Sequence, residues 1–332
     1  MNLLERMKTR AKSKPKTLVL PEGTDLRTLQ AARRIVDDEL AASVTIIGKE
    51  ADVIKLAAPA GVNLSGINIL DPAASSNLGK YAKEYYELRK YKGMSSDEAK
   101  TGILVSLRWG AMMVRLGDAD AVVAGVANAP ADVLRAGLTI IGMAGDMKTA
   151  SSFYIVETDD TSYGTNGTFL FSDGAVVPEP TAEQLADIAI ACAQSCQNFM
   201  EAKPYVALLS FSTKGSGGNH PSILKIKETL EILEAREPDL TVDGEIQADA
   251  AIIPAIADKK APGSPIRGKT NILVFPDINA ANIGVKLAQH FGKLDVYGPF
   301  LQGFSKPICN LSRAATVEEI VNTCALTLAL VK

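Results

Sequence analysis

The feature that most constrains this chain is the alternation, along its length, of short β-rich runs and longer stretches with helical periodicity. Such alternation is typical of a parallel sheet whose strands are joined by crossover helices. Only the stretch from 151 to 171 resembles an antiparallel pair, because an acidic, glycine-containing link joins its two strands. Expected strands cover residues 17–21, 43–47, 67–70, 121–124, 151–157, 168–171, 205–209, 240–242, 271–275 and 295–297. Expected helices cover residues 26–37, 73–92, 96–116, 181–200, 221–237, 247–260, 279–291 and 316–330.

The length of 332 residues predicts two domains, at about 150 residues per domain. We therefore expect an α/β fold made of two doubly wound α/β domains with a cleft between them. Sheets of this kind bind ligands beyond the carboxyl ends of their strands.

Charge and hydropathy exclude several classes of protein. The net charge is −3, from 35 Lys and Arg against 38 Asp and Glu, and this argues against a nucleic-acid partner. No uncharged apolar run reaches the roughly 18 residues that a membrane span requires. Residues 1–16 carry a charge every few positions and lack the apolar centre of a secretion signal. The expected protein is cytoplasmic, with no membrane partner.

The cysteines predict neither disulfides nor a metal site. Four cysteines in a chain of this length do not make a disulfide framework. Cys192 and Cys196 are spaced to share a helix face, but only His220 and His290 are available to complete a metal site with them. We expect no metal and no permanently bound cofactor.

One nucleotide-binding pattern occurs in the wrong structural context. Gly263–Thr270 fits GxxxxGK[ST], which binds phosphate only when a strand precedes the loop and a helix follows it. Here a charged helical stretch precedes the loop and a strand follows. The pattern therefore predicts a loop from a helix to a strand rather than a phosphate site.

A second loop has the residue types and the position in the sequence that an anion-binding loop requires. The stretch 210–218 follows a buried strand and precedes a helix, and its site candidates are Ser212, Thr213, Lys214, Gly215 and Ser216. Hydroxyls, free amides, a lysine and a following helix N-terminus can form an anion nest. The alternative is a flexible polar loop without a ligand.

Four arginines and one glutamate near strand ends or loops are the remaining candidate site residues. Arginine offers a planar, permanently charged fork that suits phosphate and carboxylate, although each arginine alone could be an ordinary surface residue. Glu319 stands in Thr316-Val-Glu-Glu319, the spacing of a capping box, and could simply cap the last helix. The arginines concerned are Arg27, Arg89, Arg135 and Arg313.

Taken in order, these segments resemble the short phosphate acetyltransferases (phosphotransacetylases) over almost the whole chain. The resemblance rests on LPEGTDLR, ELRKYKG, ADVLRAGLTIIG, LLSFSTKGS, VDGEIQADAA, FPDINAANIG and GPFLQGFSKPICNLSRAATVEEIV, which begin at residues 20, 87, 131, 208, 242, 275 and 298. It implies an enzyme that converts acetyl-CoA and phosphate reversibly into coenzyme A (CoA) and acetyl phosphate. It also implies an isocitrate-dehydrogenase-like fold, a homodimer, and a last helix that returns to the first domain. The expected domains are then residues 1–147 with 300–332, and residues 148–299.

The resemblance also implies roles for named residues. Arg313 is expected to stabilise charge in the transition state beside Ser312, and Glu319 to be the general base for the CoA thiol. Arg27, Arg89, Arg135, Asn128 and the loop 212–216 are the expected substrate-binding residues. CoA is the nucleophile, so no acyl-enzyme forms.

Departures from the family pattern leave alternatives open. Asn128-Ala129-Pro130 stands where many relatives carry hydroxyl residues, Ala281 replaces a glycine, and Ala314-Ala315 replaces a Gly-Cys pair. Glu319 stands where aspartate is common. The alternatives are a phosphate butyryl- or propionyltransferase with a longer acyl preference, and a catalytically impaired CoA-binding relative. Members tied to ethanolamine use look similar, so the pathway is open.

Overall fold

The computed structural model describes residues 3–331, and the chain divides into two compact units. The first unit runs to Gly145 and resumes at Phe304, and the second extends from Asp146 to Gly303. The units therefore end two and four residues from the boundaries expected at 147 and 299. Strand β10 (Asp295–Gln302), which the expected boundary would divide, lies whole within the second unit.

The first unit contains a parallel five-stranded sheet in the order β3-β2-β1-β4-β11. Its strands are short and carry apolar residues on both faces, as expected for a sheet covered on both sides. Their bounds are β1 (Thr17–Leu20), β2 (Ser43–Ile47), β3 (Ile67–Leu70), β4 (Ala121–Ala124) and β11 (Ile308–Asn310).

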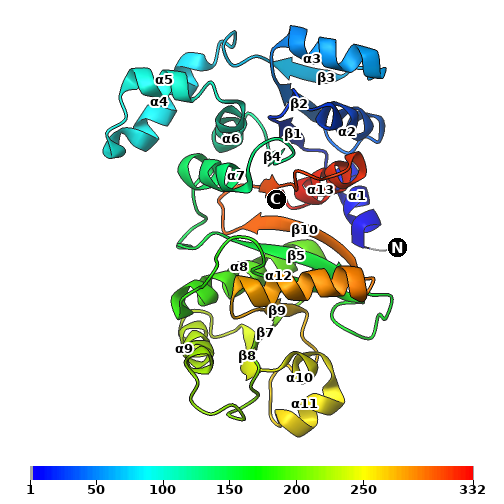
Figure 1. Cartoon of the computed structure of the whole chain (residues 1–332), viewed down its shortest axis with the longest axis vertical. Helices are drawn as coiled ribbons and strands as arrows, with labels where there is room; N and C mark the ends of the chain where they lie inside the picture. The colour runs from blue at the N-terminus through cyan, green and yellow to red at the C-terminus, as the bar shows by residue number, and fades with distance from the viewer. Residues whose placement is uncertain (1–2, 332) are drawn as a thin grey trace. The chain divides into compact units, whose positions relative to one another are not determined.

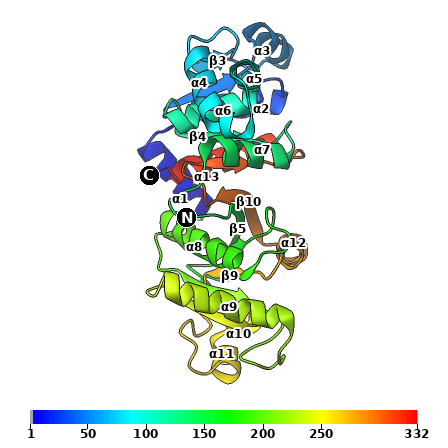
Figure 2. The same cartoon turned by 90° about the vertical axis from the view of Figure 1, so that its left-hand side faces the viewer.

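The helices of the first unit cover both faces of this sheet. In Figure 1, α6 and α7 lie on one side of β1 and β4, and α1, α2 and α13 lie on the other. The turned view in Figure 2 agrees with this layering. The elements are α1 (Leu3–Ser13), α2 (Leu26–Asp37), α3 (Glu50–Ala57), α4 (Leu78–Arg89), α5 (Ser96–Gly102), α6 (Ser106–Leu116), α7 (Pro130–Ala136) and α13 (Val317–Ala329), with short turns η1 (Ala58–Ala60), η2 (Lys90–Lys92) and η3 (Gly137–Ile141).

The strand order reverses between β1 and β4. From β1 the chain moves outward through β2 to β3, and it then returns to place β4 on the other side of β1. Doubly wound sheets bind ligands at such a reversal, beyond the carboxyl ends of the strands on either side of it, which here are β1 and β4. The loops after β1, β4 and β11 all reach this edge.

The second unit has a mixed sheet in the order β10-β5-β6-β9-β7-β8. Strands β6, β9, β7 and β8 run parallel, whereas β5 is antiparallel to both β6 and β10. The expected antiparallel pair is confirmed, but the expectation that it was the only one is wrong, because β10 also pairs antiparallel with β5, both at the expected residues 295–297 and beyond them at residues 300–302. The remaining bounds are β5 (Ser151–Glu157), β6 (Thr168–Ser172), β7 (Tyr205–Leu209), β8 (Thr241–Ile246) and β9 (Ile272–Val274).

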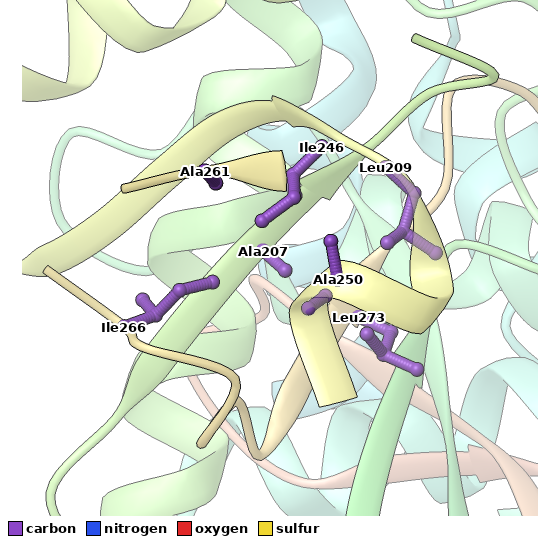
Figure 3. Packing of buried hydrophobic residues seen from close by; sticks show 8 residues of the cluster. Ala207, Leu209, Ile246, Ala250, Ala261, Ile266 and Leu273 are labelled. Atoms are coloured by element: carbon purple, nitrogen blue, oxygen red, sulfur yellow. The ribbon is translucent and has the colours of Figure 1, made fainter. Parts of the chain in front are cut away.

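Helices of the second unit connect these strands and bury their apolar faces. A cluster of small and branched side chains, including Ala207, Ile246 and Leu273, packs β7, β8 and β9 against α10 (Figure 3). Gly263–Thr270 lies between α11 and β9, which confirms a helix-to-strand loop. The elements are α8 (Ala182–Met200), α9 (Pro221–Arg236), α10 (Ala248–Ile252), α11 (Pro254–Lys260), α12 (Ile278–Lys286) and η4 (Leu287–Phe291).

Three expectations about single elements need correction. The stretches 96–116 and 247–260, each expected as one helix, are two helices each, because Val105 (φ −64°, ψ 122°) separates α5 from α6 and Ile253 (φ −108°, ψ 112°) separates α10 from α11 with an extended backbone. The last strand was expected to end at residue 297, but the chain beyond it contains the rest of β10 and then β11. Within residues 3–331 no helix combines the length and the apolar character that crossing a bilayer requires.

Candidate functional site

The site is built on the loops that follow β1, β4 and β11 in the first unit. Gly125 ends β4 with φ +123°, and a Cβ atom there would lie 2.5 Å from the carbonyl oxygen of Leu311. Only glycine permits this approach, because other residues rarely adopt that backbone and none could place a Cβ so close. The loops after β4 and β11 are therefore in direct contact.

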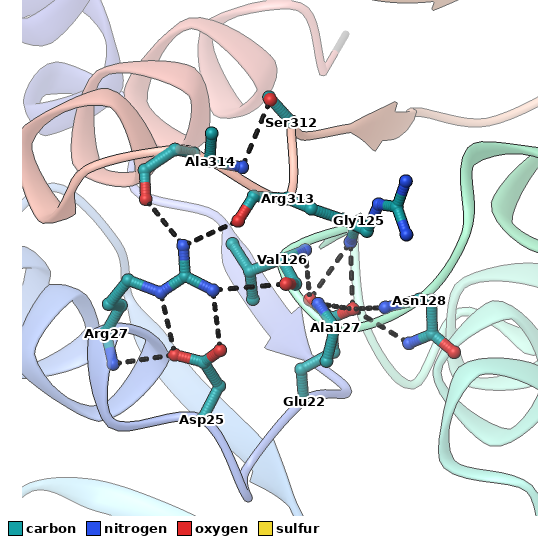
Figure 4. A network of polar contacts seen from close by, with 11 residues as sticks. Glu22, Asp25, Arg27, Gly125, Val126, Ala127, Asn128, Ser312, Arg313 and Ala314 are labelled. Carbon is teal, nitrogen blue, oxygen red and sulfur yellow. Dashed lines mark hydrogen bonds and ion pairs between the residues drawn. The ribbon is translucent and has the colours of Figure 1, made fainter.

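Glu22, which follows β1, ties the loop after β4 to the sheet. Its side chain is 5% exposed, and its two oxygens accept hydrogen bonds from four successive backbone amides, those of residues 125 to 128, at 2.7–3.0 Å. The side-chain amide nitrogen of Asn128 donates to the same carboxylate at 2.8 Å (Figure 4). Successive amides that converge on one point form an anion nest, and here a carboxylate of the chain fills it.

Arg27, in the first turn of α2, joins all three loops. Its guanidinium donates twice to Asp25, and also to the carbonyl oxygens of Val126 (3.1 Å), Arg313 (2.8 Å) and Ala315 (2.9 Å). A guanidinium has five N–H donors, so every donor of Arg27 has a partner within the chain. The side-chain hydrogen bond from Arg27 lowers the pKa of Asp25.

The guanidinium of Arg313, unlike that of Arg27, has no partner in the described chain. Its backbone is held by Arg27, whereas its guanidinium is exposed and makes no hydrogen bond or ion pair with any other residue between 3 and 331. Figure 4 shows that side chain directed away from the Arg27 network. The hydroxyl oxygen of the exposed neighbour Ser312 accepts a hydrogen bond from the Ala314 amide at 3.2 Å, which leaves the Ser312 O–H available as a donor.

Glu319 caps the last helix, as its spacing predicted. Its Oε2 atom accepts hydrogen bonds from the backbone amide of Thr316 at 2.7 Å and from the Thr316 hydroxyl at 3.0 Å, while the Thr316 hydroxyl oxygen accepts from the Glu319 amide. The capping box is thus confirmed. The side chain is exposed.

Two of the expected arginines line one pocket of about 420 Å³ in the first unit. Arg89 and Arg135 lie in its wall together with Asn128 and with Arg108, which the sequence did not single out. Arg108 donates to the Gly102 carbonyl oxygen and lies over the ring of Tyr85, 5.8 Å from its centroid, and Arg135 is paired with Asp132 at 2.8 Å. The guanidinium of Arg89 makes no hydrogen bond to another residue in the described range.

In the loop after β7 in the second unit, the charged and polar donors are bonded to carboxylates of the same unit. Lys214 is paired with the buried carboxylate of Asp243 and also donates to the Gly244 carbonyl oxygen at 3.1 Å. The Gly215 amide donates to Glu245 at 2.6 Å. The hydroxyl of Ser212 bonds to the Ser216 hydroxyl and donates to Glu245, and the Ser216 hydroxyl oxygen also accepts from the Thr213 amide. The Thr213 hydroxyl donates to Gln247. Burial raises the pKa of Glu245, but hydrogen bonds led by the Gly215 amide lower it on balance.

Sequence reasoning missed Glu22, Asp25 and Arg108. Glu22 and Asp25 belong to a turn that directly follows a buried strand, and a carboxylate at that place is the signal that could have found them. Arg108 lies inside a helical stretch, and nothing in its neighbours distinguishes it from a surface arginine.

The cysteines are far from suited to nucleophilic chemistry. All four are buried and none forms a disulfide with another described residue, and burial raises the pKa of Cys192 and Cys324, and that of Cys196 to about 12. A thiol that stays protonated is a poor nucleophile. Within the described residues, no three His, Cys, Asp or Glu side chains are grouped to hold a metal ion.

Known proteins resemble this chain over nearly its full length. A phosphate acetyltransferase of Treponema pallidum is 50% identical over 330 residues, which cover 99% of this chain and 98% of that protein. The EutD phosphotransacetylase from Staphylococcus aureus has a solved structure that matches with a TM-score of 0.90, at 34% identity over 99% of this chain and 98% of that one.

A more distant structure shows the fold alone. The 4-hydroxythreonine-4-phosphate dehydrogenase from Klebsiella pneumoniae matches with a TM-score of 0.55, at 12% identity over 95% of this chain and 98% of that one. The expected α/β fold is confirmed. Residues 2–328 match the family described as phosphate acetyl/butaryl transferase. The chain belongs to this family.

Proposed function

We propose that the chain transfers an acetyl group reversibly between acetyl phosphate and the thiol of CoA, through direct attack of the thiolate in a ternary complex. The observation that carries this mechanism is the state of Arg313, whose backbone is held in place while its guanidinium is not committed to any carboxylate of the described chain. The membership of this chain in the phosphate acetyl/butaryl transferase family supports the same reaction.

The chemistry requires a base and a group that stabilises negative charge. A free thiol has a pKa of about 8.5, so only a small fraction is thiolate near neutral pH. As the base removes the thiol proton, sulfur bonds to the acetyl carbon, the bond from that carbon to the phosphate oxygen breaks, and phosphate leaves with the electron pair. A fixed guanidinium and a hydroxyl donor stabilise the charge that develops on the carbonyl and phosphate oxygens.

In this mechanism Arg313 and Ser312 stabilise that charge and Glu319 accepts the thiol proton. Glu319 Oε2 is occupied by its capping box, whereas Oε1 has no hydrogen-bond partner among the described residues and the side chain as a whole is exposed. The buried cysteines support a mechanism without an acyl-enzyme.

We assign the arginine pocket to the anionic part of CoA. Arg89, Arg108 and Arg135 bring three permanent positive charges to one pocket, against the two carboxylates of Glu98 and Asp132, and the pocket has a volume of about 420 Å³. Asn128 lies in the same wall, and its amide nitrogen is already committed to Glu22, so its oxygen is suited to accept from a hydroxyl or amino group of CoA and not to bind a phosphate.

For the loop 212–216 we propose a structural role in place of substrate binding. The Lys214 ammonium and the Gly215 amide are already bonded to Asp243 and Glu245, so they are not available to an incoming anion. Substrate binding by this loop stays a prediction that a Lys214 variant can test.

We also propose that the two compact units are the enzyme's domains and that it works as a homodimer in the cytoplasm, where CoA is available. Ile283, Leu287 and Phe291 are 58%, 59% and 87% exposed, and their four-residue spacing places them on one face of α12 and η4. An exposed apolar stripe of this kind is typical of protein interfaces. Leu287→Asp should convert dimer to monomer in analytical ultracentrifugation, and an unchanged mass would remove this face from the interface.

The first experiment measures thioester formation from CoA with acetyl, propionyl and butyryl phosphate in parallel. We expect acetyl phosphate to give the highest kcat/KM. A preference for butyryl phosphate would instead assign the longer acyl specificity, and binding of CoA without any thioester would identify an impaired relative.

A further inference from the structure

The turn after β1 and the first turn of α2 contact the loop after β4, which carries Asn128, and the loop after β11, which carries Arg313. Glu22 accepts hydrogen bonds from the four amides of residues 125 to 128, and Arg27 donates to the carbonyl oxygens of Val126, Arg313 and Ala315. The backbone amides of the loop after β4 therefore donate to the Glu22 carboxylate, and carbonyl oxygens of the loops after β4 and β11 accept from the Arg27 guanidinium. Each partner is about 100 or more residues away in the sequence.

Arg27 has little capacity left for a substrate. Its five donors are used within the chain, and its charge lies against the Asp25 carboxylate at 2.7 Å. A phosphate that bound Arg27 would have to displace Asp25 or release the carbonyl oxygens of the Arg313 loop. Displacing Asp25 would cost a charge-assisted bidentate contact, one of the stronger hydrogen-bonding arrangements in proteins.

We infer that Arg27 is a positioning residue that holds the backbone of Arg313, and not a ligand of the substrate. The inference rests on the proposed role of Arg313. Since transition-state stabilisation depends on where the guanidinium is fixed, releasing the carbonyl oxygens of Arg313 and Ala315 lets that group move away from the reacting oxygens. Arg27 then affects kcat through Arg313, and it leaves the binding of both substrates nearly unchanged.

A double-mutant cycle tests this inference. Arg27→Ala, Arg313→Ala and the double variant are compared with the wild-type enzyme for kcat and for the KM of CoA and acetyl phosphate. We expect Arg27→Ala to lower kcat about tenfold in the wild-type background, with KM changes under about twofold, and to lower it less than about twofold in the Arg313→Ala background.

A substrate ligand would behave differently. It would raise the KM of one substrate, and its loss would cost as much in the Arg313→Ala background as in the wild type. Either result overturns the inference while leaving the role of Arg313 intact. If Arg313→Ala alone loses less than about threefold in kcat/KM, the proposed mechanism fails and the inference falls with it.

Arg27→Lys keeps the experiment decisive if Arg27→Ala unfolds. One ammonium retains the charge but cannot span the planar set of carbonyl and carboxylate acceptors, so we expect it not to restore kcat. Recovery of full activity by lysine would mean that charge alone matters, and it would overturn the inference.

Arg34→Ala is the matched control. Arg34 also lies on α2 and its side chain pairs with Glu318 of α13 at 2.6 Å, but among the described residues no hydrogen bond or ion pair joins that side chain to the three loops. An exposed pair of this kind contributes little, so kcat should stay within about twofold of the wild type. A loss equal to that of Arg27→Ala would attribute the effect to general loosening of α2 against α13 and would overturn the inference.

Discussion

The carboxyl edges of the parallel strands in the two units carry similar charged residues, and they differ in whether one cation is left without a carboxylate partner. In the second unit, Lys214 and the Gly215 amide are paired with Asp243 and Glu245, which are 3% and 1% exposed. In the first unit the carboxylates of Glu22 and Asp25 take up backbone amides and Arg27, while the Arg313 guanidinium stays uncommitted within the described chain. An anion site therefore depends on the donors that remain free, and a count of lysines, arginines and glycines does not reveal them.

The largest effect should come from Arg313→Ala. Removing the uncommitted guanidinium should lower kcat/KM by about 10²–10³, or about 2.7–4 kcal/mol of transition-state stabilisation. Steady-state thioester formation measures it, with the melting temperature as the control for folding. A loss under about threefold would place the catalytic charge elsewhere and would remove the contrast between the two edges.

Glu319→Gln should separate catalysis from capping. Glutamine also serves at this position of a capping box, so the melting temperature should stay close to that of the wild type. Loss of a general base should lower kcat by about 10². If thioester formation is unchanged, capping is the whole role of Glu319 and the base must be sought among other groups.

Lys214→Ala should affect stability more than activity. The substitution leaves the buried Asp243 carboxylate without its cation, which should cost about 1–3 kcal/mol of unfolding free energy in urea denaturation. The KM of CoA should change less than about threefold, as it should in Lys259→Ala, a control at an exposed lysine of the same unit. A large rise in KM without loss of stability would restore the loop as a substrate site.

The smallest effect concerns the pH dependence of the Asp25–Arg27 pair. Because the pKa of folded Asp25 is lowered, its contribution to stability is fully present above the unfolded-state pKa of about 3.9 and is lost as pH falls through the folded-state value. The difference in unfolding free energy between wild type and Asp25→Asn should thus be constant near neutrality and shrink in acid. A difference that grows in acid would contradict the assignment.

Much of the framework follows from local patterns. The strands at 43–47, 67–70, 121–124, 151–157 and 205–209 have the bounds that their sequences predicted, and the capping boxes at Ser95, Thr181 and Thr316 are all present. These features depend on side-chain periodicity and on contacts three residues apart, which the sequence displays directly. Strand β11 escaped prediction because three residues carry no detectable period.

By itself the sequence determined the alternating α/β framework, the caps of its helices and the resemblance to one enzyme family. Only the tertiary structure decided which charged groups are free. Arg27 and Arg313 are alike as sequence candidates, yet one is saturated by acceptors up to 288 residues away and the other is exposed. The physical reason is that a side chain's availability depends on every group within hydrogen-bonding distance, and most of those groups come from remote segments.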